Sequence, residues 1–331
     1  KPAEQTSLLA IRAVELMHEA GIPTDAIQLV PGTGATVGAA LTSDSRVSGV
    51  CFTGSTATAQ RINKVMTENM APDAPLVAET GGLNAMIVDS TALPEQVVRD
   101  VLAASFQSAG QRCSALRMLY VQKDIAGNLL DMLYGAMEEL GIGDPWALST
   151  DVGPVIDETA RKKIQDHCDK FEAKGRLLKK MNVPGKGTYV SPAVISVSSI
   201  DEMEEEIFGP VLHVATFEAK NIDKVVDEIN NRGYGLTFGM HSRVDRRVER
   251  ITSRIKVGNT YVNRNQIGSI VGSQPFGGEG LSGTGPKAGG PLYVTRFRRT
   301  AKVEEHAAPD GERVALQSLQ SALEGLGARN W

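Results

Sequence analysis

Short apolar runs alternate with helix-like patterns along most of this chain, and this alternation limits the possible fold more than any other feature. In the N-terminal part, apolar runs at 26–30, 47–52, 76–78 and 85–88 are separated by helical patterns, the longest of which covers 56–70. Strand, helix and strand in regular succession predict βαβ units on a parallel sheet. The last two runs lack polar alternation, which is typical of strands covered on both faces. We therefore expect an α/β fold.

The alternation continues with longer helices after residue 84. Helices are predicted over 94–109, 124–140, 158–174, 222–232 and 243–256, and strands over 118–121, 211–217, 236–240 and 260–262. This second α/β unit does not repeat the first. Residues 293–303 carry an alternating, arginine-rich pattern that predicts an exposed strand, whose edge would need a partner strand. The remaining tail, 304–331, is expected to be a polar linker followed by a helix.

Composition excludes several classes of partner. The chain has 331 residues, enough for two domains with separate cores. Its net charge is −4 without long runs of like charge, so neither nucleic acid nor an anionic membrane surface is an expected partner. It has no N-terminal signal pattern and no apolar stretch of the roughly 18 residues that a membrane span needs. Three scattered cysteines favour a reducing compartment. We expect a cytoplasmic protein without a metal site.

Glycine is the one residue type in clear excess. The chain contains 34 glycines, and eight of them fall between residues 272 and 290. Such density does not suit a regular helix or strand. Two interpretations remain open: a loop whose backbone amides approach a ligand, or a flexible linker. Pro275, Pro286 and Pro291 stiffen the segment, which favours the functional loop.

The segment FTGST at 52–56 follows an apolar run and opens a helix. Glycine and serine at a helix N-terminus can present donors to a phosphate. The same residues can simply cap the helix. Taken alone, the segment favours the capping interpretation, because it matches neither of the common glycine-rich phosphate motifs.

Two residues have the chemistry of a covalent catalyst. Cys113 lies in GQRCS, where polar neighbours, Arg112 among them, would favour a thiolate, although a lone cysteine is more often an inert core residue. Glu79 directly follows an apolar run, where burial would raise its pKa into the range of a general base. A capping or ion-paired glutamate remains the alternative. The histidines provide little support for a Cys/His hydrolase.

Seven motifs then occur in a recognisable order. They are KPAEQT at 1–6, PGTG at 31–34, FTGST at 52–56, ETGG at 79–82, GQRC at 110–113, EEIFGPV at 205–211 and PFGG at 275–278. Together they resemble the aldehyde dehydrogenase superfamily over residues 1–303. The resemblance implies an incomplete Rossmann-like NAD-binding domain, an α/β catalytic domain and a β-strand oligomerisation flap. The implied boundaries are 1–80 for the cofactor domain, 81–285 for the catalytic domain, 286–303 for the flap and 304–331 for the tail.

The resemblance also implies a role for each matching residue. Cys113 would attack the aldehyde carbon, and Glu79 would activate the water that hydrolyses the resulting thioester. The implied NAD contacts are Lys1, Glu4, Gly32, Gly54, Ser55, Thr80, Gly81, Glu206 and Phe208. Among them, Lys1 and Glu4 would contact the adenosine ribose, and Glu206 with Phe208 the nicotinamide ribose. A carboxylate at residue 4 favours NAD over NADP.

Within the superfamily, residues 78–89 and 261–297 resemble the L-glutamate γ-semialdehyde dehydrogenase domain of the bifunctional proline utilization A family. The implied reaction is oxidation of that semialdehyde to L-glutamate. Ser282, Gly283 and Thr284, with Ser114, are the implied contacts to the substrate's amino-acid group. The parent protein would be a homo-oligomer with a flavin-dependent proline dehydrogenase domain. Another semialdehyde or aliphatic aldehyde dehydrogenase and a non-catalytic structural relative remain alternatives.

The chain departs from the family at its N-terminus. The family's oxyanion-hole asparagine and the first strands of its cofactor domain precede the Lys1 motif. We therefore expect the sequence to be an N-terminally truncated fragment. Because losing one oxyanion donor costs about 10²–10³ in rate, the chain alone is expected to have little or no activity.

Overall fold

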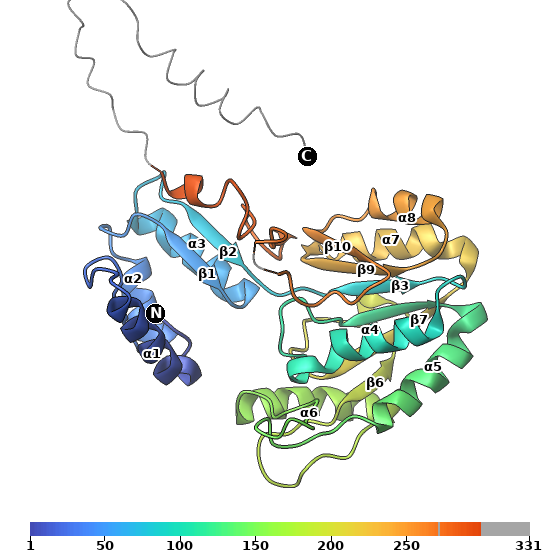
Figure 1. Cartoon of the computed structure of the whole chain (residues 1–331). Coiled ribbons are helices and arrows are strands. Elements are labelled where there is room, and N and C mark those ends of the chain that lie inside the picture. Colours follow the sequence, from blue (N-terminus) through green and yellow to red (C-terminus); the bar gives the residue numbers. More distant parts are fainter. Residues whose placement is uncertain (271, 299–331) are drawn as a thin grey trace, which may run out of the picture. The chain divides into compact units, whose positions relative to one another are not determined.

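The computed structural model describes residues 1–270 and 272–298, and Lys1–Phe297 form one compact unit (Figure 1). Its first part contains helices α1 (Ser7–Glu19), α2 (Ala39–Thr42) and α3 (Thr56–Asn69), with a π-helical turn at Gly34–Gly38 before α2. Two parallel strands, β1 (Val50–Thr53) and β2 (Leu76–Glu79), pair in register. The parallel pair with α3 between its strands confirms the predicted βαβ unit.

The predicted strand at 26–30 is wrong. The structure forms no strand there, and residues 26–30 alternate between partly buried and exposed. Within the described residues, β1 and β2 make a sheet of two strands, so no neighbouring strand offers this segment a ladder of hydrogen bonds. An apolar run alone is therefore not sufficient for a strand, because the backbone also needs a partner.

A seven-stranded sheet forms the second part, in the order β10-β9-β3-β4-β7-β6-β5. Its strands are β3 (Ala85–Val88), β4 (Met118–Gln122), β5 (Leu177–Lys180), β6 (Ala193–Ser196), β7 (Val211–Phe217), β9 (Thr237–His241) and β10 (Asn259–Val262). Neighbours are parallel except β5 and β6. A short antiparallel pair joins β8 (Tyr234–Gly235) to β11 (Glu279–Gly280). The α/β fold with a largely parallel sheet is as expected from the sequence.

Helices α4 (Pro94–Phe106), α5 (Lys123–Glu138), α6 (Glu158–Glu172), α7 (Ile222–Asn231) and α8 (Asp245–Thr252) accompany this sheet (Figure 1). Helix α4 packs on α5 and β7, and α6 packs on β5 and β6. Every residue of β3 and β4 is buried, as the unbroken apolar runs in the sequence predict. The sheet is therefore a rigid base for the loops at its edges.

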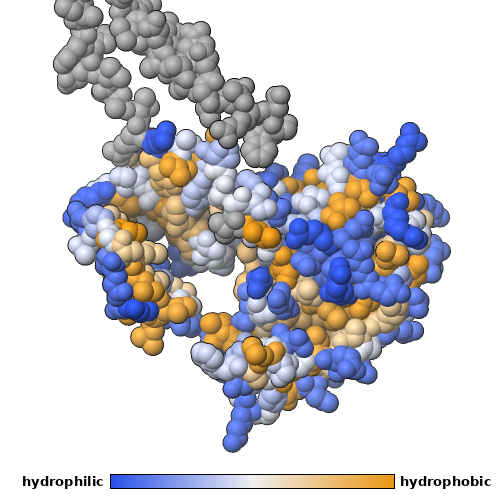
Figure 2. All heavy atoms as spheres, viewed as in Figure 1, coloured by the Kyte–Doolittle hydropathy of each residue, from blue (hydrophilic) through white to orange (hydrophobic). Residues whose placement is uncertain are grey.

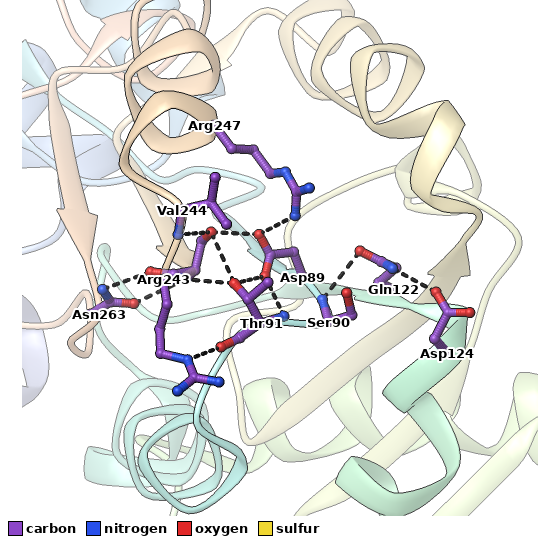
Figure 3. A network of polar contacts seen from close by, with 10 residues as sticks. Asp89, Ser90, Thr91, Gln122, Asp124, Arg243, Val244, Arg247 and Asn263 are labelled. Atoms are coloured by element: carbon purple, nitrogen blue, oxygen red, sulfur yellow. Dashed lines mark hydrogen bonds and ion pairs between the residues drawn. The ribbon is translucent and has the colours of Figure 1, made fainter.

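A buried polar network fixes one edge of this sheet (Figure 3). Asp89, which follows β3, accepts hydrogen bonds from Thr91, Ser242 and Arg247 at 2.5–2.7 Å. Burial alone would raise the Asp89 pKa, but these hydrogen bonds outweigh burial and lower it. Because β3 and β9 are parallel, the network ties together their carboxyl ends. The residues that immediately precede β3 and β4 lie at the opposite, amino-terminal ends of the strands, where the candidate site is found.

The predicted strand over 293–303 is wrong in its described part, because Val294–Phe297 form a 3₁₀ turn. The rest of that prediction and the tail at 304–331 lie outside the described residues. Helix α1 buries none of its residues, and its apolar side chains lie on the surface (Figure 2). In the part of the chain that the structure describes, no helix combines the length and apolar character that crossing a membrane requires.

Candidate active site

Glu79 is the last residue of β2, and only one of its two carboxyl oxygens has a hydrogen-bond partner among the described residues. Its Oε2 accepts a hydrogen bond from the Gly278 amide at 2.9 Å, whereas the buried Oε1 has no partner among the described residues. Burial raises the Glu79 pKa to about 7, although the Gly278 amide and the positive charge of Lys287 act in the opposite direction. A carboxyl group with this pKa can accept a proton near neutral pH, which is what a general base requires.

Two glycines allow the backbone to approach Glu79 closely. A Cβ on Gly277 would lie 2.7 Å from Glu79 Oε1, and a Cβ on Gly278 would lie 2.4 Å from the Ser282 carbonyl oxygen. Both distances are too short for any side chain. Part of the glycine excess at 272–290 is therefore explained by backbone packing around the carboxyl group, and not by flexibility.

Residues 282–284 run alongside β2. Gly283 pairs with Glu79, the Thr80 amide donates to the Ser282 carbonyl at 3.0 Å, and the Thr284 amide donates to the Ala78 carbonyl at 3.0 Å. Ser282 is fully buried, and its Oγ accepts from the Gly235 amide at 3.0 Å. These residues were predicted to bind a substrate carboxylate, but several of their polar groups already form hydrogen bonds within the protein. Their observed role is to hold β2.

Cys113 lies in a strained segment, which we call the nucleophile loop and define as residues 108–115. Ser108, Ala109 and Gly110 have φ angles of 56°, 53° and 65° in succession. Left-handed conformations cost non-glycine residues about 1–3 kcal/mol each and persist only where the surroundings enforce them. A Cβ on Gly110 would lie 2.2 Å from the Gly209 carbonyl oxygen. Contact with residue 209 therefore requires glycine at 110.

Side chains hold the carbonyl groups of three consecutive residues in the nucleophile loop. Asn84 Nδ2 donates to the Cys113 carbonyl at 2.7 Å and to the Ala115 carbonyl at 2.9 Å. Thr237 Oγ1 donates to the Ser114 carbonyl at 3.3 Å, and the Thr237 amide donates to Asn84 Oδ1. The sequence reasoning missed both residues. The available signal was their position, because each lies at the start of a buried strand.

Arg117 is a third residue that the sequence did not predict. It immediately precedes β4, and its side chain is fully buried. Its guanidinium donates to the carbonyl oxygens of Gly110 and Arg112 at 2.6 and 3.1 Å, and to Glu206 Oε1 at 3.1 Å. It also lies over the Phe208 ring, 5.1 Å from the centroid. Arg117 thus contacts both the nucleophile loop and the segment around Glu206.

The Cys113 thiol lies in an acidic, partly buried environment. Burial is the main cause that raises its pKa, the Ser114 amide lowers it, and the negative charges of Glu206 and Glu79 raise it further. The Arg112 guanidinium instead donates to Ser108 Oγ at 3.0 Å. The hypothesis that Arg112 stabilises a thiolate is therefore not supported. The thiol, Glu79 and Glu206 are close enough for their charges to interact.

The N-terminal cofactor candidates form a small polar cluster. Glu4 Oε1 lies 3.3 Å from Lys1 Nζ and accepts from the Gly34 amide at 2.8 Å. The Gly34 amide, and then Lys1, lower the Glu4 pKa below its usual range. Gly32 has a φ of 142°, which a side chain would not tolerate beside Val37. Lys1, Glu4 and Gly34 therefore contact one another, and Gly32 lies in the turn just before Gly34.

At the start of α3, the structure supports the capping interpretation. Ser55 Oγ accepts from the Thr58 amide at 3.2 Å, and the Gly54 amide donates to the Glu79 carbonyl at 3.1 Å. Beyond Glu79, Thr80 Oγ1 donates to the Leu281 carbonyl at 2.6 Å. Gly81 lies against Glu206, since a Cβ there would meet Glu206 Oε2 at 1.7 Å. The chain after the general base thus touches the predicted nicotinamide-ribose contact.

Comparisons with known proteins agree with this geometry. The family model described as "Aldehyde dehydrogenase family" matches residues 1–303. The chain therefore belongs to the aldehyde dehydrogenase family.

Relatives narrow the resemblance. The chain is 51% identical to bifunctional protein PutA from Klebsiella aerogenes, an alignment that covers 98% of this chain and 26% of that protein. A crystal structure of bifunctional proline utilization A superposes with a TM-score of 0.87 at 52% identity, over 89% of this chain and 30% of the other. A Thermus 1-pyrroline-5-carboxylate dehydrogenase with bound NAD gives a TM-score of 0.84 at 31% identity, over 89% and 58%. The chain thus spans about a quarter of the curated bifunctional relative.

Proposed function

We propose that this chain carries the catalytic thiol and general base of an NAD-dependent L-glutamate γ-semialdehyde dehydrogenase. The observation that carries the proposal is that a partly buried carboxyl group, Glu79, with its pKa raised to about 7, lies near enough to the Cys113 thiol for its charge to raise the pKa of that thiol. The substrate class is supported by the relatives, among them 1-pyrroline-5-carboxylate dehydrogenases at up to 36% identity. Pyrroline-5-carboxylate is the cyclised form of the semialdehyde.

In this proposal, the two side chains act in sequence. The Cys113 thiolate adds to the aldehyde carbon and forms a thiohemiacetal, and bound NAD supplies the hydride acceptor for its oxidation to a thioester. Glu79 then takes a proton from water as the water attacks the thioester carbon. Hydrolysis releases the carboxylic acid product and returns the thiol. Asn84 and Thr237 keep the loop that carries the thiol in a fixed orientation throughout.

The residues present have the chemistry to hold a dinucleotide. Glu4 is kept ionised by the Gly34 amide and Lys1, so it can accept hydrogen bonds from ribose hydroxyls. Glu206 is a second carboxylate acceptor, and it contacts the Arg117 guanidinium that lies over the Phe208 ring. We assign the adenosine and pyrophosphate side of NAD to Lys1, Glu4, Gly32, Gly54 and Ser55, and the nicotinamide side to Thr80, Gly81, Glu206 and Phe208.

Other features of the proposal concern the whole protein. Of the predicted substrate contacts, Ser114 follows the nucleophile and Gly283 lies beside Glu79, so these two are retained for the amino-acid end of the aldehyde. We propose that the cofactor portion ends at residue 80 and that the catalytic portion extends from residue 81 to residue 285. We further propose that the parent protein is a cytoplasmic homo-oligomer that also carries a proline dehydrogenase domain; this chain spans only 26% of its bifunctional relative, which leaves room for such a domain.

Replacement of the nucleophile tests the proposal. Cys113→Ala in the complete parent protein removes the attacking sulfur, so NADH formation from glutamate semialdehyde should be lost. Cys51→Ala is the matched control, because Cys51 is exposed on β1 and should leave the rate unchanged. Persistent NADH formation by the Cys113→Ala protein would show that the reaction does not proceed through this thiol.

Substrate specificity is tested separately by comparing kcat/KM for glutamate semialdehyde and for an aliphatic aldehyde of similar length without the α-amino acid group. A site that recognises that group should reject the simpler aldehyde strongly, because its polar contacts would be left unpaired. Equal values would assign the chain to a general aldehyde dehydrogenase.

A further inference from the structure

We infer that Arg117 is a positioning residue that couples the Glu206–Phe208 segment to the nucleophile loop, so that seating of the cofactor and placement of the Cys113 thiol depend on each other. The inference rests on the proposed function, because it takes Glu206 as a contact to the nicotinamide ribose. It adds a residue that contacts neither the cofactor nor the substrate in that proposal.

The guanidinium group of Arg117 uses every donor that it has. An arginine side chain carries five N–H donors in a planar fork. Nε and Nη2 both donate to Glu206 Oε1, at 3.2 and 3.1 Å. Nη1 donates to the carbonyl oxygens of Gly110 and Gly209, and Nη2 also donates to that of Arg112. One rigid group thus joins Glu206 to carbonyl groups on the N-terminal side of Cys113.

Two further contacts fix the position of Arg117, one to its backbone carbonyl group and one to a face of its guanidinium group. The His213 ring Nδ1 lies 3.1 Å from the Arg117 carbonyl oxygen, and the Phe208 ring lies over the guanidinium. Because the side chain is completely buried, no water is available to replace a lost acceptor. A buried cation deprived of its carboxylate partner is strongly unfavourable. Glu206 and Arg117 are therefore expected to move together.

This arrangement links two events of the proposed reaction. A ribose hydroxyl that engages Glu206 would alter the carboxylate that holds the Arg117 fork, and the fork in turn holds the carbonyls of Gly110 and Arg112. Coupling between two sites is reciprocal in binding free energy, so a change in the placement of the Cys113 thiol should in turn alter the affinity for the cofactor. Lysine cannot substitute for this role, because an ammonium group is a point charge without the planar fork.

The test measures the alkylation rate of Cys113 by iodoacetamide, with and without saturating NAD⁺, in the full chain carrying Cys51→Ala to remove the exposed thiol. NAD⁺ should change the rate severalfold. Arg117→Lys should bring the ratio of the rates with and without NAD⁺ close to one. Glu206→Gln, which preserves the shape of the side chain, should have the same effect on the ratio of the rates. This variant replaces Arg117→Lys in the test if circular dichroism shows that the Arg117→Lys protein does not fold.

Asn84→Ala is the matched control, because Asn84 holds the same loop but does not contact Glu206. It should alter the alkylation rate in both states and leave their ratio intact. An unchanged NAD⁺ effect in both Arg117→Lys and Glu206→Gln, or an equal loss in Asn84→Ala, would overturn the inference.

A cofactor-free measurement separates this inference from the proposed function. If NAD⁺ does not bind to the parent protein, the cofactor proposal fails. The inference is then decided by a double-mutant cycle between Arg117→Lys and Glu206→Gln on the alkylation rate without NAD⁺. Non-additive effects support a coupled pair that acts on the thiol, and additive effects reject it.

Discussion

At the scale of single residues, Glu79 and Asp89 show how differently two buried carboxyl groups are treated. Asp89 accepts hydrogen bonds from three side chains and keeps a lowered pKa, whereas Glu79 has one backbone donor and a pKa raised to about 7. The difference lies in the number of donors, since burial acts in the same direction on both. Asp89 is therefore suited to hold loops together, and Glu79 is suited to exchange a proton.

The raised pKa of Glu79 predicts a pH dependence. Below a pH of about 7 the carboxyl group is increasingly protonated and cannot accept a proton from water, so the hydrolytic rate should fall about tenfold per pH unit there. Above that pH the rate should level off. The measurement is kcat against pH under conditions where thioester hydrolysis limits turnover. Glu79→Gln should remove this dependence and lower kcat by about 10²–10⁴-fold; an unchanged profile would assign the base elsewhere.

At the scale of elements, the nucleophile loop depends on glycine at one position. A side chain at residue 110 would have to adopt a φ of 65° and would contact the Gly209 carbonyl at 2.2 Å. Gly110→Ala should therefore lower the free energy of unfolding by about 2 kcal/mol or more, with loss of activity as the loop shifts.

Gly135→Ala is the control for that substitution. Gly135 is exposed within α5, and a Cβ there meets no atom within 4 Å. Alanine should raise the free energy of unfolding by about 0.5–1 kcal/mol, because it lowers the backbone entropy of the unfolded chain. Denaturant unfolding of both variants measures the difference. Equal stability of the two would show that the loop relaxes around the new methyl group.

Strands β3 and β7 have the bounds predicted from their largely apolar runs. Strands β5 and β6 were not predicted: β5 is a half-exposed, antiparallel strand with an irregular register, and β6 is only four residues long. The turn at Val294–Phe297 replaced a predicted strand because alternation without a neighbouring strand does not fix an extended backbone.

The candidate site shows the same division. Glu79 and Cys113 could be proposed from local motifs, because their neighbours in the sequence carry the signal. Asn84 and Arg117 could not, because Asn84 acts through partners 29 and 31 residues away, and Arg117 joins the nearby Gly110 and Arg112 carbonyls to Glu206, which lies 89 residues away. Ser282 and Thr284 had polar groups that suited a ligand, but in the fold Ser282 Oγ accepts from the Gly235 amide of β8, and Thr284 Oγ1 accepts from the Ala78 amide of β2.

At the scale of the whole molecule, the proposed cofactor contacts extend from Lys1 to Phe208 in the sequence, all within the Lys1–Phe297 unit. A ligand that binds only the folded chain stabilises it by RT ln(1 + [L]/Kd), about 2.7 kcal/mol at a hundredfold excess over Kd. NAD⁺ should therefore raise the Tm of the full chain in a concentration-dependent manner, and differential scanning calorimetry measures that shift.

The identity of the cofactor can be read from the same measurement. Glu4 is held ionised by Gly34 and Lys1, so the 2′-phosphate of NADP⁺ would bring two negative charges together at the proposed ribose site. NAD⁺ should then raise Tm more than an equal concentration of NADP⁺. Glu4→Gln should narrow that difference, because it removes the repulsion but leaves an amide of the same size. Glu15→Gln, at an exposed position of α1 paired with Arg12, is the control and should leave the difference unchanged. A larger shift with NADP⁺ would place the phosphate away from Glu4 and reverse the proposed cofactor preference.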